Sequence, residues 1–91
     1  MDKVVVHPRI MSVHSQITLE DVLDAWENCF RAVTRLDKAS GEYIALGTDS
    51  RGRLIEMIAV CSREGDWLIF HAMTPPTKKA LEELGFAGRQ Q

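Results

Sequence analysis

Hydrophobic and polar positions are most clearly ordered in the second half of the chain, where three short apolar segments are separated by polar, glycine-containing turns. The segments span residues 42–48, 53–60 and 67–72, and the sequences Asp-Ser-Arg-Gly and Arg-Glu-Gly-Asp lie between them. Apolar segments of this length, joined by such turns, are typical of β-hairpins. We therefore predict an antiparallel meander of three strands.

A helical pattern precedes the meander. Its apolar positions recur so that they fall along one side of a helix: Leu19, Val22, Leu23, Trp26 and Phe30. Thr18 and Asp21 have the spacing of a capping box, so the helix is predicted to begin at Leu19. The opposite side is acidic, and we interpret it as a solvated surface.

Shorter elements are predicted on both sides of this helix. Pro8 can open a short helix over residues 9–14. Residues 32–36 form a candidate strand, and a polar connection follows over residues 37–41. A further short strand is placed at the beginning of the chain.

The last predicted element is a helix. Thr74 can cap it, Pro75 can take its first position, and Gly85 supplies a left-handed stop after Leu84. The order is then short strand, two helices, four strands and helix, in a single domain of residues 1–91. We predict an α+β fold with two N-terminal helices and one C-terminal helix on one face of an antiparallel sheet of three to four strands.

Composition and charge narrow the function of this 91-residue chain. Its net charge of −2 differs from the basic character of most nucleic-acid-binding domains. No apolar run approaches the ~18 residues needed to span a bilayer, so we expect a cytoplasmic protein that does not bind membranes. Cys29 and Cys61 lack the spacing of a zinc site. We expect buried free thiols, no metal and no cofactor.

The hairpin registers decide which side chains share a face of the sheet, because successive side chains point to opposite faces. If Thr48 pairs with Arg53 and Arg63 pairs with Asp66, one face collects most of the large apolar side chains: Ile44, Leu46, Ile55, Met57, Ala59, Leu68 and Phe70. We predict that this set forms the core.

The same registers place His71 opposite Ile58, with Glu56 diagonally adjacent on the other face of the sheet. A second turn of three residues, with Gly65 in a bulge, is the competing arrangement. A shift of one residue at that turn would separate Glu56 from His71.

Glu56 and His71 are the candidate acid–base residues. A carboxylate in the middle of a strand is costly unless it is paired or solvated, so Glu56 is either a general base or the partner of Arg53 or Lys78 in a salt bridge. Histidine titrates near neutral pH, which suits proton transfer. A histidine at a strand end is also a common structural residue, and both interpretations stay open.

Cations near the end of the chain are candidates for phosphate binding. Lys78 and Lys79 lie in the first turn of the predicted last helix, where positive charge opposes the helix dipole, unless an anion binds there. Pairing with Glu82 and Glu83 is the competing explanation. Two arginines at the tip of the first hairpin are further candidate phosphate contacts: Arg51 and Arg53.

Other histidine and tryptophan side chains receive structural interpretations. His7 and His14 lie near the short first helix, and we interpret both as surface or capping residues. Trp26 belongs to the apolar side of the long helix and is predicted to lie in the core. Trp67 is interpreted as packing at an edge strand, with base stacking as the alternative.

The order of these pieces resembles that of a known family. The likeness is carried by His14 ahead of the Ile-Thr-Leu-Glu-Asp-Val helix start, by Glu-Tyr-Ile-Ala-Leu-Gly at 42–47, by Gly-Arg-Leu-Ile-Glu at 52–56, and by Ile-Phe-His-Ala-Met at 69–73. Over roughly residues 14–84, the layout resembles the BrnT-like branch of the RelE/ParE toxin superfamily. The chain departs from that layout at its last motif, which ends in methionine where the family has arginine.

The resemblance implies the toxin of a bacterial type II toxin–antitoxin pair, a metal-independent endoribonuclease that binds RNA and is silenced by a cognate antitoxin. An RNA 2′-hydroxyl would attack the adjacent phosphate. His71 or Glu56 would accept the proton, and Arg53, which matches the family's Gly-Arg arginine, would stabilise the charge on the phosphate. The implied substrate-binding residues are Tyr43, Arg51, Lys78 and Lys79.

A non-catalytic interaction module is the alternative function. The mixed face of the predicted sheet carries an apolar group large enough to hold a partner protein or a second copy of the chain in a homodimer: Leu54, Ile58, Val60, Ile69 and Trp67.

Overall fold

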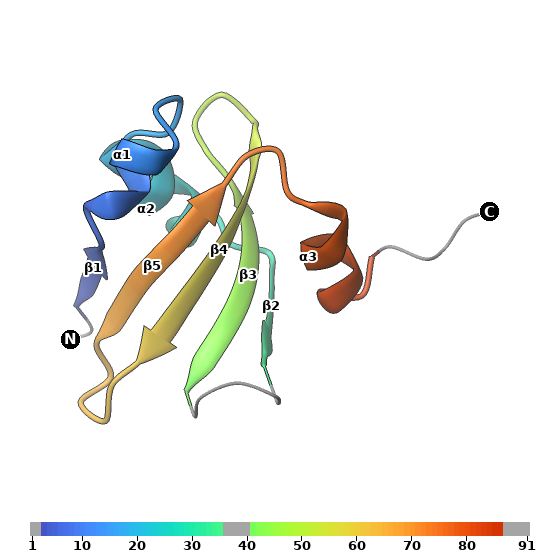
Figure 1. The fold of residues 1–91 in the computed structure, drawn as a ribbon. Helices are drawn as coiled ribbons and strands as arrows, with labels where there is room; N and C mark the ends of the chain where they lie inside the picture. Colours follow the sequence, from blue (N-terminus) through green and yellow to red (C-terminus); the bar gives the residue numbers. More distant parts are fainter. Residues whose placement is uncertain (1–2, 36–40, 87–91) are drawn as a thin grey trace.

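The computed structural model describes residues 3–35 and 41–86, so the predicted connection over residues 37–41 lies largely outside the described residues. The elements follow the predicted order (Figure 1): β1 (Val4–Val6), α1 (Arg9–Val13), α2 (Leu19–Glu27), β2 (Arg31–Thr34), β3 (Glu42–Thr48), β4 (Leu54–Cys61), β5 (Trp67–Met73) and α3 (Lys78–Glu83). The predicted α+β class is confirmed. No helix within the described ranges is long and apolar enough to cross a membrane.

The strands form one mixed sheet of five strands in the order β1-β5-β4-β3-β2, where an antiparallel sheet of three to four strands was predicted. Strands β2 to β5 are antiparallel neighbours, whereas β1 pairs in parallel with β5. Backbone hydrogen bonds from Trp67 N–H to Lys3 O (2.7 Å) and from His7 N–H to Ile69 O (2.8 Å) fix the β1 edge. The apolar Val4–Val6 segment indicates a strand, but nothing in its local sequence shows that β5 is its partner.

Helices cover both faces of the sheet, which corrects the prediction that all helices lie on one face (Figure 1). On β3, Ala45 packs into the cluster that holds the buried residues of α1 and α2. Its neighbours Ile44 and Leu46 pack instead against Ala80 and Leu84 at α3. Because β3 is buried on both sides, its pattern does not reveal which face is the core.

Helix α2 packs closely on β3. The Thr18 hydroxyl accepts the Asp21 N–H and the Asp21 carboxylate accepts the Thr18 N–H, so the predicted capping box and helix start are confirmed. Gly47 makes the close approach to this helix feasible, since a Cβ atom there would lie 1.9 Å from the backbone oxygen of Ala25.

The register of the first hairpin differs from the prediction by one residue. Thr48 pairs with Leu54, not with Arg53, because the Asp49 carboxylate accepts the backbone N–H groups of Arg51 and Arg53 and closes a loop one residue longer. A shift of one residue moves every side chain of one strand to the other face. The predicted core set is therefore split: Ile44 and Leu46 face α3, whereas Ile55, Met57 and Ala59 face α1 and α2.

The second hairpin follows the shifted register of the competing three-residue turn near its turn, and the favoured register farther along the strands. Near its turn, Cys61 pairs with Trp67, which is one residue away from the predicted register. A β-bulge at Phe70 then restores the predicted pairing of His71 with Ile58. As a result, Ile69 is fully buried and Phe70 is partly exposed, the reverse of the predicted core membership.

Helix α3 begins later than predicted. Thr77, not Thr74, is its N-cap and accepts the Ala80 N–H, and the helix starts at Lys78. Thr74 is instead buried, and its hydroxyl donates to the Leu54 carbonyl at 2.6 Å. The predicted left-handed stop at Gly85 is confirmed by its φ of 92°.

Candidate functional site

Glu56 and His71 form a hydrogen-bonded pair between β4 and β5. The distance from His71 Nε2 to Glu56 Oε2 is 2.8 Å. The Glu56 side chain is 5% exposed and the His71 side chain is 33% exposed, so the carboxylate is buried behind an imidazole that reaches solvent. The predicted diagonal neighbourhood of these two residues is confirmed.

The Glu56 carboxylate is held by two donors. Its Oε1 accepts the backbone N–H of Thr77 at 2.6 Å, and its Oε2 contacts Nε2 of His71. Burial raises the pKa of Glu56, but the hydrogen bonds from His71 and Thr77 outweigh burial and lower this pKa below its ordinary value. The side chain is therefore ionised at neutral pH, and the amide at the start of α3 already has an anionic partner within the chain.

An ionised carboxylate can only accept hydrogen bonds, so it selects the form of the His71 ring that carries hydrogen on Nε2. In the neutral imidazole, the lone pair is then on Nδ1. This arrangement presents a proton acceptor whose orientation is fixed by a buried carboxylate, as in hydrogen-bonded catalytic pairs generally.

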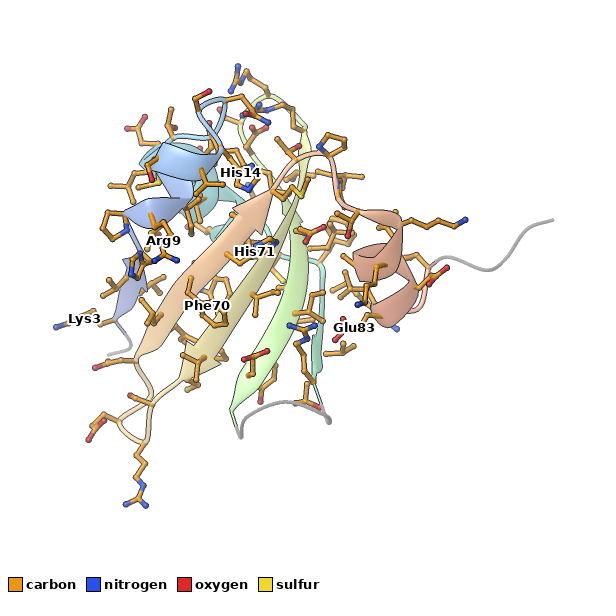
Figure 2. The ribbon with its side chains drawn as sticks, in the orientation of Figure 1. Lys3, Arg9, His14, Phe70, His71 and Glu83 are labelled. Atoms are coloured by element: carbon orange, nitrogen blue, oxygen red, sulfur yellow. The ribbon has the colours of Figure 1, made fainter. Side chains whose placement is uncertain are left out.

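A second imidazole lies beside this pair. The rings of His14 and His71 have their centroids 6.4 Å apart and are nearly perpendicular, at 88°. Together with Arg9 of α1 and Phe70 of β5, they line a cavity of about 200 Å³. Figure 2 places these side chains along the part of β5 next to α1. The site thus contains two histidines, one carboxylate and one arginine.

A second hollow of about 190 Å³ borders His71 on the side of α3. Glu56 and Lys79 line it, and Arg35 and Glu83 line it as an ion pair at 2.6 Å. The hydrogen bond that Arg35 donates to the Glu83 carboxylate raises the pKa of Arg35, which also pairs with Glu42 at 3.0 Å. Both predicted lysines are exposed, but only Lys79 lines the hollow that Glu56 and His71 also line, whereas Lys78 lines neither hollow.

Arg53 and Arg51 lie outside this site. Arg53 donates to Asp49 at 2.7 Å and to Asp21 of α2 at 3.0 Å, and Arg51 reaches the same Asp21 carboxylate at 3.4 Å. Burial raises the pKa of Asp49, but the hydrogen bonds from Arg53 and Arg51 lower this pKa by more than burial raises it. The pKa of Asp49 is therefore below its ordinary value. These arginines join the first hairpin to α2, on the face of the sheet opposite Glu56.

Tyr43 belongs to a separate aromatic group. Its ring centroid lies 5.1 Å from that of Trp67, which lies 5.1 Å from Trp26. The three rings line a hollow of about 350 Å³ on the α2 face of the sheet, together with half-buried Cys29 and exposed Ala32. Both cysteines are free, as predicted, but they are half-buried where buried thiols were expected.

The predicted interaction surface does not form a single face. Leu54, Ile58 and Val60 are alternate residues of β4 on the side of Glu56, whereas Trp67 and Ile69 lie in or against the core under α1 and α2. Ile69 has no exposed surface. The shifted register near the second turn separates the two groups.

Sequence reasoning missed Arg9 and His14 as members of the site. His14 is the C-cap of α1, which agrees with its interpretation as a capping residue. Its position beside His71 depends on the pairing of β1 with β5, which carries α1 to the edge of β5. The apolar Val4–Val6 segment was the only local sign of that pairing.

No family model, curated protein or solved structure matches the chain. Within residues 3–35 and 41–86, no three histidine, cysteine, aspartate or glutamate side chains are grouped so that they could hold a metal ion.

Proposed function

We propose that this protein is a metal-independent endoribonuclease, the toxin of a bacterial type II toxin–antitoxin pair, with its active site at Glu56, His71 and His14. The observation that carries the proposal is the 2.8 Å contact between Glu56 and the solvent-facing His71, with a second imidazole 6.4 Å away. Two histidines at this separation can contact one phosphate group from two sides, as a general base and a general acid must.

In the proposed reaction, the 2′-oxygen of one nucleotide attacks the adjacent phosphorus. The neutral His71 ring accepts the 2′-hydroxyl proton at Nδ1, while Glu56 stabilises the imidazolium that forms. The bond from phosphorus to the 5′-oxygen of the next nucleotide breaks, and protonated His14 donates a proton to that oxygen. The products are a 2′,3′-cyclic phosphate and a 5′-hydroxyl.

Cations on both sides of His71 favour this anionic substrate. Arg9 lines the hollow shared by the two histidines, and Lys79 lines the hollow on the side of α3. Positive groups placed before the reaction stabilise the charge that develops on the phosphate oxygens. In this proposal, Arg9 takes the role that the family resemblance implies for Arg53, since the Arg53 guanidinium is bound to two aspartates.

The proposal is tested by RNA cleavage with purified protein in the presence of EDTA. His71→Ala and His14→Ala should each lower the cleavage rate by about 10²- to 10⁴-fold, and the wild-type rate should have a bell-shaped pH profile. His7→Asn is the matched control, because His7 is exposed and lines neither hollow. Undiminished cleavage by the His71 and His14 variants would refute the assignment.

The toxin role has its own test in cells. Induced expression of the wild-type chain should inhibit bacterial growth, His71→Ala should abolish the inhibition, and the product of an adjacent small gene should reverse it. An equal growth defect with the wild type and with His71→Ala would show that the toxicity does not come from this site.

A homodimeric, non-catalytic module is the second candidate function. It is favoured by the hollow under Trp26, Tyr43 and Trp67, an aromatic surface suited to a partner chain. Gel filtration over a range of concentrations tests this candidate. A stable dimer that Trp67→Ala dissociates, without growth inhibition or RNA cleavage, would favour the module over the enzyme.

A further inference from the structure

Phe70 interrupts the pairing of β4 with β5. Ile69 pairs with Ala59 and His71 pairs with Ile58, so Phe70 is an extra residue with no partner opposite it. Such bulges re-aim a side chain and are frequent next to active sites. Here Ile69 is fully buried, but Phe70 is 38% exposed, so the bulge brings an aromatic ring to the surface directly beside His71.

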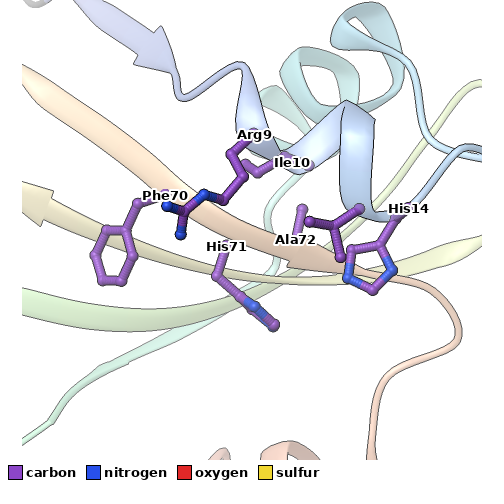
Figure 3. Close-up of a pocket in the computed structure, with 7 residues that line it drawn as sticks. Arg9, Ile10, His14, Phe70, His71 and Ala72 are labelled. Atoms are coloured by element: carbon purple, nitrogen blue, oxygen red, sulfur yellow. The ribbon is translucent and has the colours of Figure 1, made fainter.

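The Phe70 ring shares a cavity with the two histidines. Figure 3 shows Phe70 and His71 extending to the same side of β5, with the Arg9 side chain reaching toward them from α1. The cavity volume of about 200 Å³ is below the usual range of roughly 300 to 1,000 Å³ for ligand pockets. It therefore suits a small part of a larger ligand, such as a single nucleotide of a chain.

The geometry points to Phe70 as a platform on which a nucleobase next to the scissile phosphate stacks, and hence to single-stranded RNA as the substrate class. This inference rests on the proposed ribonuclease function. Stacking on an aromatic ring tolerates any base, because every base has a flat face. In a duplex, neighbouring bases cover those faces, so only an unpaired nucleotide can place its base on Phe70.

Arg9 and Phe70 are expected to contribute in ways that an experiment can separate. A guanidinium that contacts phosphate makes RNA binding depend on salt, whereas stacking on a phenyl ring does not. Arg9→Ala should therefore flatten the dependence of the dissociation constant on salt. Phe70→Ala should weaken RNA binding by the same factor at each salt concentration.

The test measures binding of a short, fluorescein-labelled single-stranded RNA of mixed sequence that carries 2′-O-methyl groups, which block cleavage. Phe70→Ala should weaken binding about tenfold, and Phe70→Tyr should bind like the wild type because it keeps the ring. The matched control is Phe86→Ala, since Phe86 is 43% exposed and packs beside Phe30, not beside the histidines. A duplex of the same sequence should bind more weakly than the single strand.

Abasic RNAs identify the partner of the ring. The set contains RNAs that each lack the base at one position. The RNA that lacks the base stacked on Phe70 should bind the wild type about tenfold more weakly than the intact RNA does. The Phe70→Ala variant should bind this abasic RNA and the intact RNA equally well, because it has no ring for the base to stack on. If Phe70→Ala binds single strands like the wild type, while cleavage still depends on His71, the stacking role is refuted and the ribonuclease stands. If the wild type neither binds nor cleaves RNA, both proposals fail.

Discussion

Glu56→Gln tests whether the buried carboxylate acts through its charge. The substitution keeps the length of the side chain and an oxygen that can accept the Thr77 N–H, but it removes the negative charge opposite His71. We expect a less stable protein that also loses cleavage activity, because a neutral amide no longer selects the His71 form with hydrogen on Nε2.

The size of the stability effect follows from the two contacts of Glu56, at 2.6 Å to Thr77 and 2.8 Å to His71. Hydrogen bonds to charged groups contribute about 1.5 to 3 kcal/mol each, and neutral ones about 0.5 to 1.5 kcal/mol. Replacing two charged contacts by neutral ones therefore costs about 2 kcal/mol at neutral pH. In a domain of this size, that cost lowers the midpoint of thermal unfolding by roughly 10 °C.

The effect depends on pH with a defined sign. Because the pKa of Glu56 is lowered on folding, the stability from its ionised form is fully present above the ordinary pKa and is lost as the pH falls through the lowered pKa. Thermal unfolding followed by circular dichroism should thus show a difference between wild type and Glu56→Gln that shrinks from about pH 5 to below about pH 4.

Glu64→Gln is the control for this measurement, since Glu64 is an exposed residue of the turn between β4 and β5. It should change the free energy of unfolding by less than about 0.5 kcal/mol at any pH. Equal stability of Glu56→Gln and wild type at neutral pH would refute the reasoning. So would a difference that stays the same after acidification.

Two further predictions concern the scaffold that positions the site. Asp49→Ala should destabilise the fold by roughly 2 to 3 kcal/mol in urea titrations, because it leaves two backbone N–H groups and one bond of Arg53 without an acceptor; an unchanged urea midpoint would contradict it. Gly47→Ala should cost at least about 1 to 3 kcal/mol by the same assay, since its Cβ would meet the Ala25 backbone oxygen at 1.9 Å. Wild-type stability of that variant would show that α2 lies farther from β3.

Local features of the sequence were sufficient to predict the order of the elements, although not the residue at which α3 begins. The Thr18 and Asp21 cap, the bounds of β3 and the stop at Gly85 depend on neighbouring residues, and each was predicted correctly. The pairing of His71 with Ile58 was also predicted, although the route to it was not, because the displaced turn and the bulge at Phe70 compensate each other.

Only the tertiary structure decided which elements meet. The Asp49 side chain closes the first loop and shifts the register, β1 joins β5 across more than half of the chain, and Glu56 binds the amide of Thr77 where α3 begins. Each of these contacts joins groups whose partner a local pattern does not specify. The sequence by itself determined the order of the helices and strands, and it placed Glu56 near His71. Long-range pairing and packing on both faces of the sheet brought His14 and Arg9 to that pair and kept Arg53 away from it.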